Sequence, residues 1–562
     1  MQCNMLAQNE IAIAVRDNTQ TLKKFSDYLS RNHTKHDTLY YFIPFLTTIA
    51  DYGKDIPEHD LSIIYIMSHY ILLKVGFPKY KKALESLTPR HWLYCSPVIA
   101  SSKTEIANAP LTAKLSYVAL AQGLRCPIDE VIFMDVCNEI KANGIPRTWF
   151  KDTCTLVDLL MTISHSIYTL SVKATRGKSV PDCFNLSRAA IARGMMAPTL
   201  AARNEVAKLP FDSRRILCVM DKPFKSGSDF IAASGFLEAL RDANYTLDVC
   251  YCIWNEEAKI EPVNIFDQAY PIRIRELTQP FKCRYKSVFF ITHAFALEPY
   301  ILSMKLADHT MGMLGHLCSS GFDLNHFFIP EWDEGSYSER NLVRLPGMAC
   351  CLPNISLREV NKVSRTKTLI AVALTGEKLN KTVGPRLAAI TKIAEGLNIE
   401  VDFCILLGSD ADAAIRTTSL VNLHLLPYLD PSNFNIICND KAGYFGTIEQ
   451  CDFVICMQPY TPYISALDFV SACKPIVVLR EPNRVGSQYA ARILEVLGLD
   501  FCVAGNTDEE MQFITDLLNK KYCTQITNKI RESFNADLIN EHNARVSTAF
   551  MDKLYDIGYT VE

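Results

Sequence analysis

The sequence predicts an α/β protein in which two doubly wound parallel sheets follow an all-α N-terminal region. Apolar residues show helical spacing up to about residue 205, and two series of apolar strands alternating with helices begin after residues 209 and 353. We therefore expect an all-α domain over residues 1–205, a first Rossmann-like domain over 206–353, and a second over 354–562 that includes C-terminal helices.

The composition is that of a folded globular protein. Of the 562 residues, 49% are hydrophobic and 21% are charged, so no long stretch is expected to be disordered. Lys and Arg number 58 against 61 Asp and Glu. This balance provides no electrostatic footprint for nucleic acid or an anionic membrane, and neither partner is expected.

The 20 cysteines are scattered, many within apolar runs such as Ile216–Val219 and Val401–Leu406, and none forms a C-x-x-C pair. We expect small buried side chains rather than a metal or redox site. Residues Met1–Glu10 lack the pattern of a signal peptide, so the expected location is cytoplasmic. The most apolar stretch, Leu61–Phe77, is short and contains polar residues, which favours a buried helix over a membrane span.

In the N-terminal region, Leu22, Phe25 and Leu29 recur at helical spacing, as do the apolar residues of Leu156–Ile163. The first strand series then begins with Arg215–Asp221, which is followed by a loop and a helix over Asp229–Ala243. Further strands of this series are expected at Thr246–Ile253 and Ser287–Ile291.

The second series alternates five expected strands with four helices. The strands are Thr368–Ala373, Glu400–Leu407, Val421–Leu426, Phe453–Met457 and Pro475–Leu479. The helices are Gly384–Leu397, Ala442–Gln450, Ser465–Ala472 and Gln488–Leu497, and the tail Ile526–Tyr559 is expected to form helices that close this domain. Since ligands of such sheets bind at the carboxyl ends of the strands, functional side chains are expected there.

The loop over Thr375–Lys381 follows the strand that ends at Ala373. It places Lys378 and Asn380 where a diphosphate would lie, next to helix amides that favour an anion. The alternative is a solvated surface loop.

A second candidate follows the strand Phe453–Met457 and contains Tyr460, Ser465 and Asp468. Ser465 can offer its hydroxyl and amide to phosphate, and Asp468 can accept both hydroxyls of a ribose. The alternative is helix capping, because the two residues fit the S-x-x-D pattern.

Three weaker candidates remain. Gly315 and His316 can place an imidazole in the cleft, although a lone histidine is more often structural. Asp229 can act as a general base, but Ser228 can instead cap the helix with Asp229 in its first turn, which we favour. Gly408 begins a segment with a D-x-D pattern, for which a helix cap is favoured over a metal–nucleotide site, so no metal is expected.

Residues 210–540 resemble the O-GlcNAc-transferase-like glycosyltransferases of the GT-B fold, and within them the bacterial cytoplasmic N-glycosyltransferases that modify adhesins. Segments with the family's order and spacing carry this resemblance. They are Leu306–Asp323, Ser338–Pro346, Lys378–Asn380, Cys451–Asp468 and Leu497–Glu510.

The resemblance implies an α/β GT-B fold with twin Rossmann-like domains after an all-α N-terminal domain. It implies an inverting, metal-independent enzyme that needs no cofactor and moves a hexose from a UDP-sugar to Asn, Ser or Thr of a secreted adhesin. Lys378 would contact the donor diphosphate, Asp468 the ribose, and His316 the sugar or the acceptor, while Asn380, Gly408, Tyr460, Ser465 and Gly315 would complete the site.

The chain also departs from the family. Tyr463–Ser465 replaces a more polar triplet, Lys222–Ser228 lacks the histidine expected to activate the acceptor, and Cys438–Asp440 occupies the place of another histidine. These departures indicate an altered sugar, an altered acceptor or lost catalysis. The alternatives are therefore a non-catalytic scaffold or partner and, with less support, a sugar-nucleotide epimerase.

Overall fold

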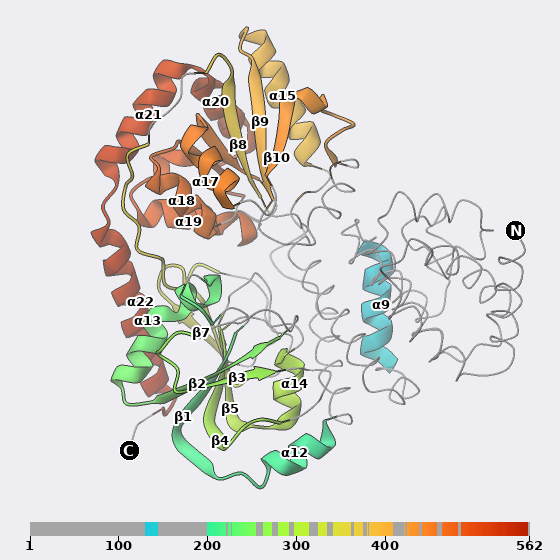
Figure 1. The fold of residues 1–562 in the computed structure, drawn as a ribbon, viewed down its shortest axis with the longest axis vertical. Coiled ribbons are helices and arrows are strands. Elements are labelled where there is room, and N and C mark those ends of the chain that lie inside the picture. The colour runs from blue at the N-terminus through green and yellow to red at the C-terminus, as the bar shows by residue number, and fades with distance from the viewer. Residues whose placement is uncertain are drawn as a thin grey trace, which may run out of the picture. The chain divides into compact units, whose positions relative to one another are not determined.

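The computed structural model describes residues 130–143, 199–220, 223–225, 227–253, 262–272, 279–291, 297–313, 324–333, 341–360, 365–374, 379, 382–407, 421, 424–437, 441–457, 463–481 and 485–559 (Figure 1). Its contacts divide the chain into two compact units, Met1–Ile167 and Tyr168–Glu562. In the first unit the described residues form helix α9 (Glu130–Asn143), which buries Val136, Cys137 and Ile140. The helices expected at Leu22–Leu29, Leu61–Phe77 and Leu156–Ile163 lie outside the described residues.

The second unit contains a seven-stranded sheet whose paired strands are all parallel, in the order β3-β2-β1-β4-β5-β6-β7. The strands are β1 (Phe211–Val219), β2 (Thr246–Cys252), β3 (Gln268–Ile272), β4 (Arg284–Phe290), β5 (Ala307–Met313), β6 (His326–Pro330) and β7 (Leu342–Leu345). The accompanying helices are α12 (Leu200–Val206), α13 (Ser228–Asp242) and α14 (Leu297–Met304).

The second sheet of this unit has six parallel strands in the order β10-β9-β8-β11-β12-β13. Its strands are β8 (Thr368–Leu374), β9 (Val401–Leu407), β10 (Phe434–Ile437), β11 (Phe453–Cys456), β12 (Ile476–Leu479) and β13 (Val503–Ala504). Its helices are α15 (Val383–Gly396), α17 (Lys441–Gln450), α18 (Tyr463–Ser471), α19 (Val485–Val496), α20 (Thr507–Leu518), α21 (Lys520–Ser533) and α22 (Asp537–Asp556), with short 3₁₀ turns at Pro431–Asn433 and Asp500–Cys502.

The predicted α/β class is confirmed, and the two parallel Rossmann-like sheets are both present (Figure 1). Every residue of β8, β11 and β12 is buried, which explains why these strands appear in the sequence as continuous apolar runs. The cysteines in such runs are also buried, and burial raises the pKa of the Cys218 and Cys404 thiols. They behave as the small apolar side chains that the sequence predicts.

One predicted strand is wrong. Val421 and His424 have helical backbone instead, and residues 425–428 form turns. Val421, Leu425 and Leu429 are all buried at a spacing of four, as on one face of a helix. On the side of β9 that faces away from β8, the paired strand is β10.

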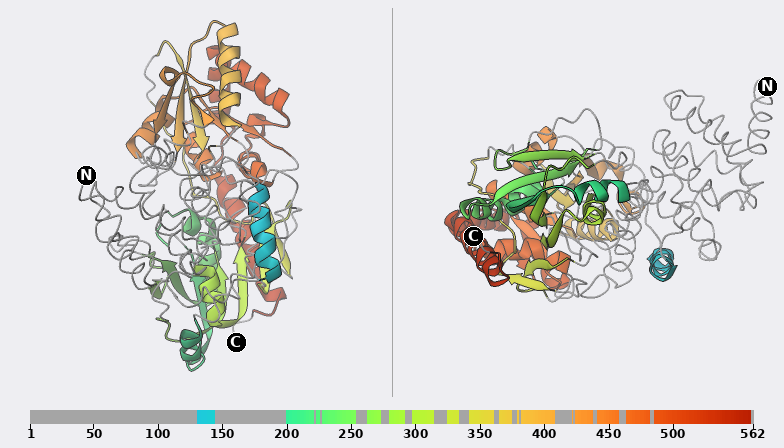
Figure 2. Two further views of the ribbon diagram at one scale, coloured as in Figure 1. Left: turned by 90° about the vertical axis from the view of Figure 1, so that its right-hand side faces the viewer. Right: turned by 90° about the horizontal axis from the view of Figure 1, so that it is seen from below.

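The final helix returns to the first sheet. Figures 1 and 2 show α22 beside α13, and its Phe550 ring lies 4.5 Å from Phe236, 4.9 Å from Phe328 and 5.7 Å from Phe289. The Asn543 side-chain amide accepts a hydrogen bond from the backbone N–H of Leu352 and donates one to the Leu352 carbonyl, each at 2.8 Å. The expectation that the whole tail closes the second domain is therefore wrong for α22, because its aromatic residue completes the core of the first sheet.

Gly384 in the first turn of α15 has no room for a side chain. A Cβ atom there would lie 2.1 Å from the His424 carbonyl oxygen and 2.5 Å from Cδ2 of Tyr428. We expect Gly384→Ala to destabilise the protein by about 1–3 kcal/mol in urea unfolding, because overpacking outweighs the better helix propensity of alanine. Gly396→Ala in the same helix is the control: nothing lies within 4 Å of its Cβ position, and its stability should not fall. Equal effects at both glycines would contradict this account.

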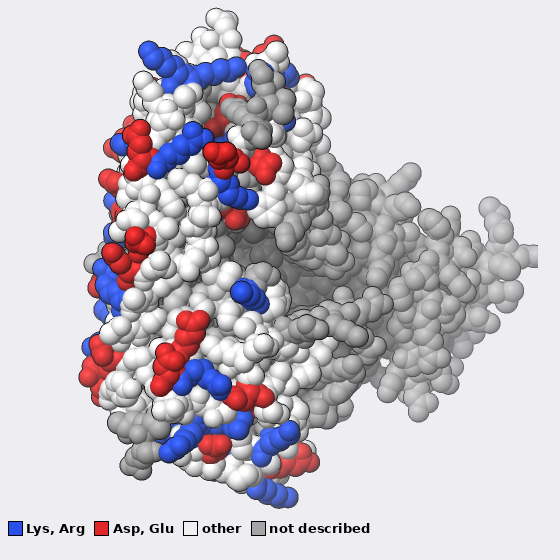
Figure 3. All heavy atoms as spheres, turned by 60° about the vertical axis from the view of Figure 1, so that its left-hand side comes forward, with Lys and Arg blue, Asp and Glu red and all other residues white. Residues whose placement is uncertain are grey.

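Figure 3 shows one face of the molecule on which the charges of the described residues alternate in sign. Lys and Arg side chains lie among Asp and Glu side chains there, without a large field of one sign. None of the helices formed by the described residues has the length and apolar character needed to cross a membrane.

Candidate functional site

The candidate site lies at the carboxyl edge of the second sheet. β8 and β11 are parallel neighbours, with Ala373 paired to Cys456, so their carboxyl ends lie side by side. Helix α15 follows β8 and helix α18 follows β11. Ligands of doubly wound sheets bind at this edge, where helix N-termini offer free amides to anions.

Asp468 and Ser465 both lie on α18 and converge on Tyr444 of α17. The Tyr444 hydroxyl donates to Oδ2 of Asp468 at 2.9 Å, and the Ser465 side chain lies close enough to lower the pKa of this phenol. Ser465 is the third residue of α18 and therefore lies inside the helix. The capping alternative for the S-x-x-D pattern is wrong, since that pattern requires the serine to precede the helix.

Burial has the largest effect on the pKa of the Asp468 carboxyl. Burial raises the pKa of its carboxyl above the ordinary value, while the Tyr444 hydrogen bond and the positive charge of Arg358 lower it. Burial also raises the pKa of Tyr444, so this phenol stays protonated and can only donate to the carboxylate. The pair is held in one geometry, which suits a carboxylate that accepts hydroxyl groups from a ligand.

Arg358 lies outside α18 and is hydrogen-bonded to Ser471, the last residue of that helix. Its Nε and Nη2 donate to the Ser471 hydroxyl at 3.1 and 2.8 Å, and its backbone N–H donates to the Ser471 carbonyl at 2.6 Å. The guanidinium also lies 5.6 Å from the centre of the Phe445 ring. Sequence reasoning missed both Arg358 and Tyr444, and the only local signal was the aromatic pair Tyr444–Phe445 just before β11.

On the α15 side of the edge, the described residues are Leu379 and those from Thr382 onward. Leu379 is 1% exposed, and Val383 and Gly384 are buried in the first turn of the helix. The apolar residue of the predicted Lys378–Asn380 segment is therefore anchored in the core. Lys378 and Asn380 themselves lie outside the described residues, as do Gly408 and Tyr460.

Of the predicted site residues around the first sheet, the structure describes only some. Asp229 lies in the first turn of α13, as expected, and is buried with 8% exposure. The N-cap of α13 is Gly227, without a side-chain cap bond, so the prediction that Ser228 caps this helix is wrong. Gly315, His316 and the segment Cys438–Asp440 lie outside the described residues.

The described residues contain no group of three His, Cys, Asp or Glu side chains arranged to hold a metal ion. Within the described part of the edge, the polar groups brought together are one carboxylate, one phenol and one serine hydroxyl. Such groups recognise hydroxyl-bearing ligands through hydrogen bonds.

Comparison with known proteins gives structural likeness alone. No protein-family model and no curated protein matches the chain. An O-GlcNAc transferase mutant from Thermobaculum terrenum is similar over 94% of this chain and 98% of its own, with 13% identity and a TM-score of 0.48. OtsA in its apo form covers 62% of this chain and 100% of its own, with 9% identity and a TM-score of 0.41. A TarM mutant from S. aureus, bound to Fondaparinux, alpha-GlcNAc-glycerol and UDP, covers 59% and 99%, with 9% identity and a TM-score of 0.36.

Proposed function

We propose that the protein is a glycosyltransferase that binds a nucleotide-sugar at the carboxyl edge of its second sheet. The observation that carries this proposal is the Tyr444–Asp468–Ser465 group, in which α17 before β11 and α18 after it converge. A fixed carboxylate at this edge is the feature by which doubly wound sheets bind the hydroxyls of a nucleotide ribose. The proposed donor is a UDP-sugar, used without a metal or other cofactor.

The proposed reaction is a single inverting displacement at the anomeric carbon. An acceptor amide or hydroxyl forms a bond to C1 while the bond from C1 to the diphosphate oxygen breaks and UDP leaves. Negative charge gathers on the leaving group, and Lys378 with the first-turn amides of α18 would stabilise it, each by about 3 kcal/mol. Asp229 is the candidate base that takes the acceptor proton, and His316 would face the sugar or the acceptor.

The proposed acceptor is a side chain of a polypeptide, Asn or Ser/Thr of a secreted adhesin-type protein. This finer part of the proposal depends on the resemblance of residues 300–505 to the bacterial N-glycosyltransferases. A panel of UDP-sugars with a co-encoded secreted protein tests it by intact-mass analysis. A hexose added to that protein supports the proposal, whereas transfer only to a small molecule contradicts it.

Asp468→Asn is expected to weaken UDP binding at least tenfold, measured by calorimetry, because ribose hydroxyls lose a charged acceptor. The change keeps the size of the side chain and an oxygen that can face Tyr444. Asp508→Asn is the matched control, since it makes the same change at an exposed residue of α20 and should leave affinity unchanged. Equal affinity of wild type and Asp468→Asn would remove this carboxylate from the site.

The same titration distinguishes the enzyme from a non-catalytic scaffold. The scaffold is favoured by the segment Lys222–Ser228, which lacks the histidine that the resemblance leads one to expect. If wild-type protein shows no UDP binding at millimolar concentration, the donor-binding proposal fails and the scaffold remains.

A further inference from the structure

A cavity lies at the amino edge of the second sheet. It has a volume of about 460 Å³, which is within the range of small-molecule sites, roughly 300–1,000 Å³. Its walls come from the residues just before β8, β11 and β12 and from one face of α21. The charged side chains that line it are Arg365, Lys367, Lys474, Lys520, Arg531 and Asp452.

Positive charge dominates this cavity, with five cationic side chains against one carboxylate. Two of the cations already have structural contacts: Lys367 lies 3.2 Å from Asp402, and the buried Lys474 donates to the carbonyls of Glu449 and Cys451 at 2.7 and 2.9 Å. These contacts leave the other three cations as the groups that can face a ligand.

Arg365, Lys520 and Arg531 form this outer group. All three are exposed, and none is in an ion pair with another residue of the described part of the chain. Lys520 donates to the backbone carbonyl of Arg365 at 3.4 Å, which brings the start of α21 to the residue at the mouth of the cavity. Guanidinium groups bind phosphate oxygens through two parallel hydrogen bonds, so two arginines at one cavity suit a phosphorylated ligand.

Thr368 supplies an independent observation. This residue begins β8 and lines the cavity, it is only 2% exposed, and its Oγ1 has no hydrogen-bond partner among the described residues. A buried hydroxyl without a partner destabilises a protein, and such groups are rare in folded structures. A ligand oxygen in the cavity would give this hydroxyl its partner.

The cavity is separate from the proposed donor site. Thr368 and Leu374 are the two ends of β8, whose seven residues span about 20 Å at a rise of about 3.3 Å per residue. The carboxyl edge, where α18 begins after β11, therefore lies at the other end of the strands. We infer that the amino-edge cavity binds a small phosphorylated ligand, held by Arg365, Lys520, Arg531 and the Thr368 hydroxyl, as a second site on this domain.

The test uses inorganic pyrophosphate as the probe, titrated by calorimetry into the full chain carrying Asp468→Asn. This substitution weakens the proposed donor site and leaves every residue that lines the amino-edge cavity unchanged, so the measured heat reports the cavity. We expect saturable binding at millimolar or lower concentration. Lys520→Ala should weaken it at least tenfold, whereas Lys521→Ala, the adjacent exposed lysine of α21 that does not line the cavity, should leave it unchanged.

Thr368→Val separates a ligand-binding role from a structural one. Valine keeps the shape of the side chain and removes the unpartnered hydroxyl, so the melting temperature without ligand should stay or rise while pyrophosphate affinity falls. The inference is overturned by any of three results: no saturation by about 10 mM pyrophosphate, equal affinity of the Lys520→Ala and Lys521→Ala variants, or binding of a polymeric anion such as heparin without binding of pyrophosphate. Loss of UDP binding alone does not contradict the inference of an amino-edge site, because the two sites are tested by different ligands.

Discussion

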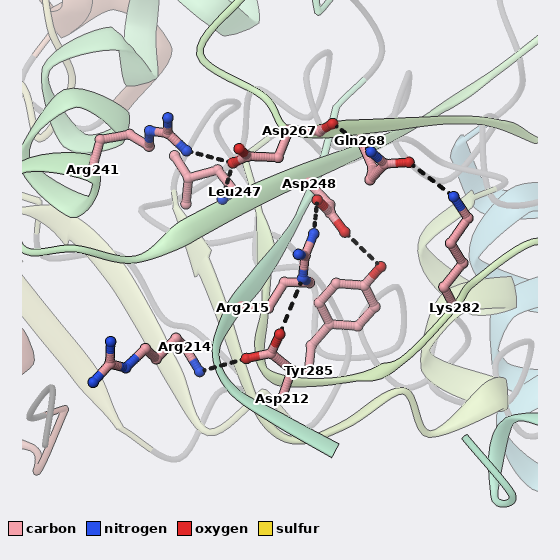
Figure 4. Close-up of polar contacts among 10 residues, drawn as sticks. All are labelled: Asp212, Arg214, Arg215, Arg241, Leu247, Asp248, Asp267, Gln268, Lys282 and Tyr285. Atoms are coloured by element: carbon pink, nitrogen blue, oxygen red, sulfur yellow. Dashed lines mark hydrogen bonds and ion pairs between the residues drawn. The ribbon is translucent and has the colours of Figure 1, made fainter. Parts of the chain in front are cut away.

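Asp248→Ala should destabilise the protein by about 3–5 kcal/mol, the typical effect of removing one partner from a buried ion pair. Figure 4 shows the Asp248 carboxylate between Arg215, whose Nη1 lies 2.7 Å from Oδ1, and Tyr285, whose hydroxyl donates to Oδ2 at 3.1 Å. The Asp248 side chain is 0% exposed and that of Arg215 is 24% exposed. The substitution therefore leaves the buried phenol without its acceptor, and Arg215 keeps only the more exposed Asp212 as its ion-pair partner.

Asp267→Ala is the matched control for this prediction. Asp267 pairs with Arg241 nearby in Figure 4, but the two side chains are 37% and 40% exposed. Such exposed pairs contribute roughly 0–1 kcal/mol. Urea unfolding, followed by circular dichroism, measures both variants. If the two alanine variants lose the same stability, burial does not control the strength of these pairs.

Burial disfavours the charged form of the Asp248 carboxylate, and its hydrogen-bond and ion-pair partners offset this effect only in part. Burial raises its pKa, although the charge of Arg215 and the hydrogen bond from Tyr285 lower it. Any stability from this elevated pKa is present at low pH and is lost as the pH rises through the folded-state value. A double substitution of Arg215 and Asp248 by apolar residues should therefore cost less than Asp248→Ala alone.

Lys378→Ala is expected to lower UDP-sugar turnover by about 10²–10³-fold with nearly unchanged melting temperature. The physical reason is the charge that develops on the leaving diphosphate, which the lysine would stabilise at the carboxyl end of β8. Release of UDP from the donor measures the rate. The melting temperature separates a chemical role of the lysine from a structural one.

Lys392→Ala provides the control for that experiment. Lys392 is an exposed lysine of α15, so the net charge changes equally while the carboxyl edge keeps its own residues. An unchanged rate in Lys378→Ala would remove this lysine from the proposed mechanism, and equal losses in both variants would indicate an effect of overall charge.

The strands that are easiest to predict from the sequence are those buried on both faces. β8 and β11 are continuous apolar runs, and a long apolar run between helices has few other structures to adopt. β5 and β7 were not predicted because half or more of their residues are not buried and their side chains are mixed in polarity. Pairing with neighbouring strands fixes the backbone of both, and sequence periodicity cannot detect such pairing.

The segment Val421–Leu426 shows how an apolar pattern can be assigned to the wrong element. Its apolar density suggested a strand, but the buried residues Val421, Leu425 and Leu429 are spaced by four. The helical period was present in the sequence over a window longer than the predicted strand. Asn422 and Leu423 lie outside the described residues.

The part of the candidate site that comes directly after a strand could be predicted from the sequence. Ser465 and Asp468 were found because they come directly after an apolar strand, where parallel sheets bind ligands. Tyr444 and Arg358 lie 24 and 110 residues away from Asp468 along the chain, and folding alone brings them to α18. Contacts over such separations leave no periodic signal, so these partners appear only in three dimensions.

The position of α22 also sets the order in which the protein can mature on the ribosome. The strands of the first sheet emerge early, yet Phe236, Phe289 and Phe328 receive their last aromatic neighbour from Phe550. All of the second sheet must be synthesised in between. The nascent first sheet therefore keeps an open apolar face until α22 has been synthesised, which makes it a substrate for chaperones during that interval.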